Sequence, residues 1–243
     1  MPSGSGGRAS AFADKRGRDP ARAGAFGPLR LDAWTVGGQK IGRGPTSRHG
    51  RVIVVSPPYE LELGGGLRLR SAIPADADAI AALHADSWSR HYRGAYSDDY
   101  LDGDAHEDRR SVWRARLRVA SEDQITIVAE REDGLAGFAH TCCDADPEWG
   151  ALLDNLHVRY DRKRQGMGRA LMGETAATLV ERHPASPLYL WVLQQNTAAQ
   201  AFYAALGGAV VDQELARPIA GGGTARVYRV AWRDPRVLLR SVA

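Results

Sequence analysis

Hydrophobic and polar positions follow regular patterns along most of the chain, and the patterns alternate between the periods of strands and helices. The stretch "LRLRSA" at 67–72 alternates apolar and polar residues, which predicts a strand with one exposed face. Pro74 then opens a segment in which Ile80 and Leu83 recur at helical spacing. A second helix is expected over about 105–120.

The second half of the chain predicts a further series of strands and helices. Two β-rich runs within 125–143 are joined at Asp133-Gly134, which predicts a hairpin. After this hairpin we expect a strand at 150–158, a helix over about 167–182, a strand at 187–194, a helix over about 197–206, and a final antiparallel pair, "AVVDQ" and "TARVYRVAW". This order of elements predicts an α+β fold with helices packed on one sheet.

The composition divides the chain into a tail and a folded domain. Residues 1–66 contain 14 of the 27 Gly and 6 of the 12 Pro. Such a segment buries too little apolar surface to offset its chain entropy. We therefore expect a disordered tail at 1–65, a single domain at 66–235 and a short C-terminal tail at 236–243. Within the first tail, "RVIVV" at 51–55 is an alternative extra strand. A start codon assigned too far upstream would give the same composition.

Charge and the longest apolar runs exclude several classes of protein. The formal net charge is +3, but residues 1–66 carry +5 and the remainder carries −2. The folded part is therefore not expected to bind nucleic acid, although the basic tail keeps that hypothesis open at lower rank. The apolar runs are too short to cross a bilayer, and the N-terminus lacks the apolar core of a signal peptide. A cytoplasmic protein is the default expectation.

The two cysteines, Cys142 and Cys143, are adjacent in the sequence. Neighbouring residues of a strand point to opposite faces, so a disulfide between them would need unusual geometry. The seven His are scattered, and no other spacing is typical of metal ligands. We therefore expect a reducing compartment and no metal.

A basic, glycine-containing stretch, "DRKRQGMGRAL" at 161–171, directly precedes the apolar pattern of a helix. The first amides of a helix lack intrahelical acceptors and attract anions, and two glycines let that backbone approach a ligand. Lys163, Arg164 and Arg169 add positive charge. A dinucleotide fingerprint would need a third glycine where Leu171 stands, and a P-loop would need Gly-Lys-Ser/Thr. The stretch predicts a pyrophosphate site of another kind, unless it is only a solvated basic run.

A strand, a basic-x-x-Gly-x-Gly loop and a helix together resemble the pyrophosphate-binding segment of the GNAT superfamily, the acetyl-CoA-dependent N-acetyltransferases. The family pattern is Gln/Arg-x-x-Gly-x-Gly/Ala. The chain reads Lys163-Arg164-Gln165-Gly166-Met167-Gly168, so the first position departs from the pattern but keeps its charge.

A second match to the same family lies in the last expected helix. The family carries Asn-x-x-Ala-x-x-x-Tyr there, followed by Gly-Phe. This chain has Asn196, Ala199 and Tyr203 at that spacing, with Gly208 in place of the Phe. The resemblance covers about 66–235.

The resemblance implies a mixed, mostly antiparallel central sheet with helices on both faces. It also implies an acyltransferase that moves the acetyl group of acetyl-CoA to a primary amine of a small molecule or peptide, by direct attack in a ternary complex. A non-catalytic acyl-CoA-binding or sensor domain is the alternative. Homodimers are common in the superfamily, so a homodimer is a further expectation.

The resemblance also implies the residues that would hold the co-substrate. The backbone of the strand before the loop would bind the pantetheine arm and the acyl oxygen, the loop would bind the pyrophosphate, and Tyr203 would donate a proton to the leaving thiolate. The expected co-substrate contacts are Leu156, His157, Val158, Lys163, Arg164, Gln165, Gly166, Met167, Gly168, Arg169, Asn196, Ala199 and Tyr203. A packing role is the alternative for Tyr203.

The amine acceptor needs a base and a cleft. Asp154 is the candidate base, because alternation along its strand would place it on the face of Leu156 and Val158. Asp98, Asp99, Glu148 and His157 are weaker options, and Asp154 is equally well a surface carboxylate without a role. The stretch "WSRHYRGAY" predicts an acceptor cleft lined by Trp88, His91, Tyr92 and Tyr96, unless these aromatics only pack the first two helices.

Overall fold

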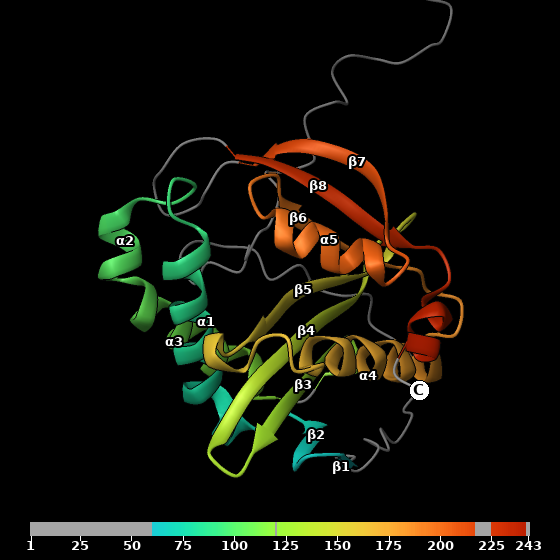
Figure 1. The fold of residues 1–243 in the computed structure, drawn as a ribbon, viewed down its shortest axis with the longest axis horizontal. Coiled ribbons are helices and arrows are strands. Elements are labelled where there is room, and N and C mark those ends of the chain that lie inside the picture. Colours follow the sequence, from blue (N-terminus) through green and yellow to red (C-terminus); the bar gives the residue numbers. More distant parts are fainter. Residues whose placement is uncertain (1–59, 120, 217–224, 242–243) are drawn as a thin grey trace, which may run out of the picture.

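The computed structural model describes residues 60–119, 121–216 and 225–241, which form one eight-stranded sheet with helices on both of its faces (Figure 1). The strands are β1 (Glu60–Leu63), β2 (Leu67–Ser71), β3 (Gln124–Arg131), β4 (Gly134–Asp146), β5 (Gly150–Val158), β6 (Leu188–Leu193), β7 (Ala209–Ala216) and β8 (Ala225–Trp232). Their order is β1-β2-β3-β4-β5-β6-β8-β7, and only β5 and β6 are paired parallel among the described strands. The expected mixed, mostly antiparallel sheet is confirmed.

Five α-helices accompany the sheet in the described part: α1 (Ala77–His91), α2 (Asp98–Asp102), α3 (Ala105–Leu117), α4 (Met167–Arg182) and α5 (Thr197–Ala205). Alternate residues of one strand pack on different helices. Val128 of β3 lies in one hydrophobic cluster with Trp113 of α3, whereas its neighbour Ile127 lies in another cluster with Leu171 of α4. This is the period of two that a pleated strand imposes. Helices on both faces, as the resemblance implied, are therefore confirmed.

The parallel pair β5 and β6 is the feature that opens the sheet. The two strands are paired only through Ala151 opposite Leu188 and Leu152 opposite Tyr189. Beyond that point β5 stays with β4 as far as Val158, while β6 stays with β8. The strands therefore diverge, and backbone groups on the facing edges are left without a partner in the ladder.

A β-bulge interrupts the pairing of β4 with β5 next to this divergence. His140 lies opposite Asn155 and Thr141 lies opposite Leu153, so Asp154 is an extra residue with no opposite partner. A bulge of this kind changes which face the following side chains point to.

The expected boundaries of the domain need two corrections. Glu60–Leu63 had been assigned to the tail but forms β1, in which Leu61 pairs with Leu69 of β2. The 3-10 helix Pro235–Ser241 replaces most of the expected C-terminal tail, and its Leu238 is 1% exposed in the core beside α4. Both segments are too short for their periodicity to be read without their partners. The remainder of the expected tail, with the alternative strand at 51–55, lies outside the described residues.

Candidate active site

A cleft of about 490 Å³ lies where β5 and β6 diverge. It is bounded by α1, the loop before α4, the N-terminus of α4 and the inner face of α5. Of the thirteen expected co-substrate contacts, all except Gln165 line it. Gln165 does not line the cleft, and its side-chain amide donates to the backbone carbonyl of Asp161 at 3.5 Å, so a contact through its side chain stays a prediction.

The loop before α4 has the backbone of an anion site. Arg164 has a φ of +62° and Gly166 a φ of +78°, both in the left-handed region, which is costly for a residue with a Cβ. Gly166 is the N-cap of α4 and no side chain caps the helix. The first turn contains no acidic residue, and Arg169 lies in it instead. A cation there opposes the helix dipole, so a bound anion would offset an otherwise unfavourable arrangement.

Gly168 allows α5 to pack closely against this helix. A Cβ at that position would lie 3.3 Å from the ring of Phe202, closer than most such contacts allow. Phe202 also lines the cleft. The two glycines of the loop therefore have different uses, since Gly166 provides the left-handed turn and Gly168 the close approach of the two helices.

Lys163, which stands where the family pattern has Gln or Arg, is bonded to α1. Its Nζ lies 2.8 Å from Nε2 of His91, and Nδ1 of His91 donates to the carbonyl of Ser87 at 2.8 Å. Because a carbonyl only accepts, Nδ1 carries the proton, and Nε2 can accept from the ammonium. Burial, together with nearby Arg90, lowers the pKa of Lys163 below its ordinary value.

The helix α5 presents two side chains to the other end of the cleft. Asn196 caps the helix, and its Oδ1 accepts a hydrogen bond from the amide of Ala199 at 3.1 Å. Tyr203 lines the cleft and is 9% exposed. Burial alone raises the pKa of Tyr203 above its ordinary range, so its phenol keeps its proton at neutral pH.

The expected position of Asp154 is wrong, because of the bulge. Leu156 and Val158 pack against the α4 side of the core, whereas the carboxylate of Asp154 lies 2.8 Å from a guanidinium nitrogen of Arg116, on α3. Both side chains of this ion pair are 7% exposed. Asp154 does line the cleft, but its negative charge is matched by a buried cation, which removes the basis on which it was predicted to be the base.

His157 is the titratable side chain of β5 that faces the α1 side of the cleft. Its Nδ1 lies 2.8 Å from Oγ of Ser87, and its ring centroid lies 4.7 Å from that of His84. Burial lowers the pKa of His157 to about 3, with smaller contributions from His91 and Lys163. The imidazole is therefore neutral at physiological pH.

The comparisons with known proteins agree with this geometry. A family model described as an acetyltransferase (GNAT) domain matches residues 122–207. The uncharacterised N-acetyltransferase YuaI of Bacillus subtilis is 29% identical over 132 residues, which cover 53% of this chain and 72% of YuaI. These two matches support the assignment of the chain to the GNAT superfamily.

Solved structures show the same GNAT fold. The PaiA N-acetyltransferase of Thermoplasma acidophilum, in complex with coenzyme A, aligns with a TM-score of 0.55 at 19% identity, covering 68% of this chain and 99% of PaiA. The protein yncA of Salmonella typhimurium, with its cofactor acetyl-CoA, aligns with a TM-score of 0.52 at 19% identity, covering 68% and 92% of the two chains.

The expected acceptor residues divide into two groups. His91 and Tyr92 line the cleft. Trp88 and Tyr96 do not, and this corrects the prediction. They are 3% and 5% exposed, and their rings stack at 5.0 Å within the core between α1 and the sheet. Trp191 of β6, which sequence reasoning missed, does line the cleft. It is half-buried within an otherwise buried strand, and that exposure follows from the divergence of β5 and β6.

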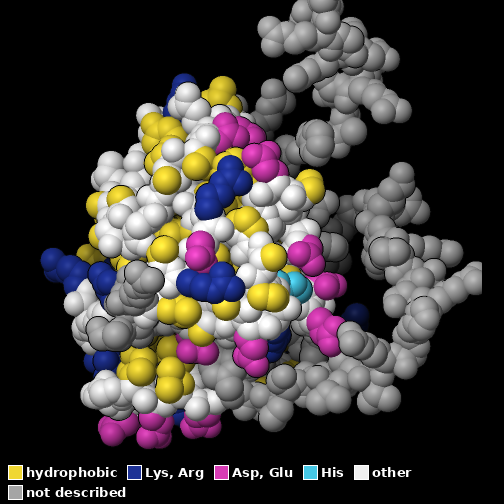
Figure 2. Space-filling view, turned by 90° about the vertical axis from the view of Figure 1, so that its right-hand side faces the viewer, with side chains coloured by type: hydrophobic (Ala, Val, Ile, Leu, Met, Phe, Trp, Pro, Cys, Tyr) yellow, Lys and Arg dark blue, Asp and Glu magenta, His cyan; other side chains and the backbone are white. Residues whose placement is uncertain are grey.

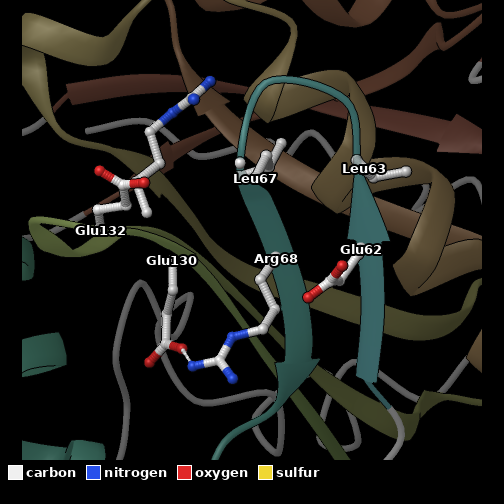
Figure 3. Close-up of a pocket in the computed structure, with 8 residues that line it drawn as sticks. Glu62, Leu63, Leu67, Arg68, Glu130 and Glu132 are labelled. Carbon is white, nitrogen blue, oxygen red and sulfur yellow. Dashed lines mark hydrogen bonds and ion pairs between the residues drawn. The ribbon is translucent and has the colours of Figure 1, made fainter.

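A smaller cavity of about 360 Å³ lies between the turns that join β1 to β2 and β3 to β4 (Figure 3). In Figure 3 the side chain of Arg68 points toward Glu130, and its guanidinium lies 2.6 Å from that carboxylate and 2.9 Å from Glu60. Since the guanidinium already has two carboxylate partners within the protein, the cavity offers little to a charged ligand, and the larger cleft is the candidate site.

On the face shown in Figure 2, positive side chains are interspersed with negative and apolar ones rather than gathered into one basic patch. None of the helices in the described ranges is long and apolar enough to span a membrane.

Proposed function

We propose that this GNAT protein is an N-acetyltransferase that moves the acetyl group of acetyl-CoA to a primary amine of a small molecule or peptide, by direct attack in a ternary complex. The observation that carries the proposal is the left-handed loop at Arg164 and Gly166, which presents the N-terminus of α4 to the cleft where β5 and β6 diverge. The likeness to PaiA and yncA, whose structures contain coenzyme A or acetyl-CoA, supports it.

The co-substrate is held mainly by backbone. The amides of Met167 and Gly168 bind the pyrophosphate, and Lys163 and Arg164 add charge. The pantetheine arm follows the free edge of β5 near Leu156, where the ladder with β6 has ended. A cleft of about 490 Å³ is within the range of small-molecule and cofactor sites.

Acetyl transfer forms a bond between the amine nitrogen and the acyl carbon and breaks the bond between that carbon and sulfur. The thiolate that leaves needs a proton or a strong hydrogen bond. Tyr203 supplies it, because its phenol is protonated at neutral pH and lines the same cleft. Backbone amides of β5 next to Leu156 stabilise the negative oxygen that develops on the acyl group.

The proton released by the amine leaves to solvent, while His157 offers the attacking nitrogen a hydrogen-bond acceptor. This imidazole is neutral at physiological pH, lines the cleft and is oriented by Ser87. With so low a pKa, this imidazole accepts a hydrogen bond from the attacking nitrogen but does not hold its proton. The acceptor therefore attacks as its neutral amine, between Tyr92 and Trp191, two of the aromatic side chains that line the cleft.

Calorimetric titration of the purified protein with acetyl-CoA, followed by a thiol-release assay with a panel of amines, tests the proposal. We expect saturable binding of acetyl-CoA and release of coenzyme A that depends on the added amine. Binding without amine-dependent release would support the sensor alternative instead. No binding at millimolar acetyl-CoA would reject both.

A further inference from the structure

Three side chains that sequence analysis did not connect lie together on the α3 side of the sheet. His140 and Cys142 are two residues apart on β4, and Asp154 is the bulged residue of β5. One imidazole nitrogen, the sulfur and a carboxylate oxygen all lie within 4.8 Å of one another. Among the described residues this is the one group of three such side chains at ligand distance.

The bulge is what brings the third side chain to the other two. The position between His140 and Cys142 is Thr141, which belongs to the opposite face of β4. A regular partner strand would likewise direct its middle residue to that opposite face. Because Asp154 is an extra residue between Leu153 and Asn155, its carboxylate turns instead toward the imidazole and the thiol.

The imidazole is oriented as in a metal ligand. Nδ1 of His140 lies 2.8 Å from Oγ1 of Thr126, and Nε2 lies 3.8 Å from Sγ of Cys142. Metal-bound histidines usually donate a hydrogen bond from one ring nitrogen to an oxygen and coordinate through the other. Asp154 is likewise held, by the side-chain amide of Asn155 at 2.7 Å and by Arg116 at 2.8 Å.

The separation of the donor atoms suits a tetrahedral ion. Zinc lies about 2.0–2.1 Å from a histidine nitrogen and about 2.3 Å from a thiolate, so the two donors in a tetrahedral site are about 3.5 Å apart. The observed 3.8 Å between Nε2 of His140 and Sγ of Cys142 needs only a small adjustment. One thiolate, one imidazole and one carboxylate also form a donor set that favours zinc over magnesium.

We propose that His140, Cys142 and Asp154 form a binding site for Zn²⁺ or another thiophilic divalent cation, with its fourth position toward the cleft that Asp154 lines. On binding, the Cys142 thiol releases its proton to solvent and the sulfur coordinates as thiolate. Arg116 remains paired with one carboxylate oxygen of Asp154, and its positive charge repels the metal ion. Metal binding is therefore weaker than at a four-ligand structural zinc site and is reversible. Its ligands do not include Tyr203 or His157, the side chains proposed to act in acetyl transfer.

The adjacent cysteines provide a matched control for the test. Cys143 belongs to the α4 side of the core, where burial raises the pKa of its thiol to about 11. The full-length protein, treated with a chelator and then dialysed, is titrated with Co²⁺ while the thiolate-to-cobalt absorption in the near ultraviolet is followed. We expect a saturable band in the wild type and in Cys143→Ser, which Zn²⁺ removes and Mg²⁺ does not.

Replacing ligands gives the decisive comparison. Cys142→Ser abolishes the band, and His140→Gln weakens cobalt binding by about a hundredfold or more, since even an outer partner of a ligand costs tenfold to a hundredfold. Thr126→Val, which removes such an outer partner, weakens it by about tenfold. Absence of the band in the wild type, or its persistence in Cys142→Ser, would overturn the proposal. Cys142→Ser is nearly isosteric at a half-buried position, so the test holds even if His140→Gln does not fold.

Discussion

The carboxylate of Asp154 and the guanidinium of Arg116 form an ion pair of 2.8 Å in which both side chains are 7% exposed. The pair joins β5 to α3 and lies directly beside the candidate active site. The pair places a buried positive charge against the carboxylate of Asp154, which lines the cleft.

Breaking this pair from either side should destabilise the protein. Arg116→Gln leaves the carboxylate of Asp154 without its cation, and we expect the free energy of unfolding to fall by about 3 kcal/mol. The double variant Arg116→Gln/Asp154→Asn should be more stable than the sum of the single losses predicts. Urea denaturation of the four proteins measures this coupling, and strictly additive losses would contradict an ion pair.

Tyr203→Phe should lower turnover by about a hundredfold while changing the affinity for acetyl-CoA by less than about twofold. The phenol is expected to act on the departing sulfur, not on the nucleotide. Steady-state kinetics and calorimetry separate the two effects. Tyr228→Phe is the matched control, because Tyr228 packs against the core and does not line the cleft. Unchanged turnover in Tyr203→Phe would leave Tyr203 a packing role only.

The rise of the reaction rate with pH should reflect the pKa of the acceptor amine rather than the pKa of a group on the enzyme. His157 stays neutral at any pH well above about 3, so it contributes no acidic limb in the usual range. The acidic limb comes instead from the neutral fraction of the amine, whose pKa is near 10.4 for a lysine side chain and about 7.7–8.0 for an α-amine. Profiles of kcat/KM for the two acceptor types should therefore be displaced from each other. A limb at one fixed pH for both would point to an enzyme group as the base.

Gly166→Ala should weaken acetyl-CoA binding through the backbone alone. A Cβ at Gly166 meets nothing within 4 Å, but a φ of +78° costs an L-residue roughly 1–2 kcal/mol. If the loop relaxes out of the left-handed region, its amides move away from the pyrophosphate, and the dissociation constant should rise by about tenfold. Gly66→Ala, with a φ of +68° in the turn before β2, carries similar strain away from the cleft. That control should lose stability but keep its affinity.

Stability should fall on mild acidification because the buried imidazoles of His84, His140 and His157 resist protonation. Burial lowers the pKa of all three below the ordinary value, which the unfolded chain retains. Below about pH 6.5 the unfolded state binds more protons than the folded state, so the stability contributed by the neutral imidazoles is lost as pH falls toward their folded pKa values. Each contributes about 1.4 kcal/mol per pH unit. Denaturant unfolding at about pH 7.5 and about pH 5.5 measures the difference, and equal stability at both would contradict the burial of neutral imidazoles.

Much of the candidate co-substrate site is encoded locally, so its loop and helix could be predicted from the sequence. The loop at 161–166 depends on glycines and charges that are neighbours in the chain, and the helix after it depends on apolar residues at helical spacing. The expected bounds of about 167–182 coincide with α4, Met167–Arg182. The alternation of strand residues likewise predicted the β3–β4 hairpin and the strand 150–158.

Only the tertiary structure decided which polar side chains meet. The direction of Asp154 depends on a bulge, and a bulge is a property of the register between β4 and β5 rather than of either strand alone. The same holds for the group of His140, Cys142 and Asp154, which exists because that register brings them together. Trp88 and Tyr96 were assigned to the cleft because aromatic residues are common both in hydrophobic cores and in ligand sites. Only their burial in the folded chain distinguishes these two roles. Periodicity shows which residues share a face of one element, whereas contacts between elements require the folded chain.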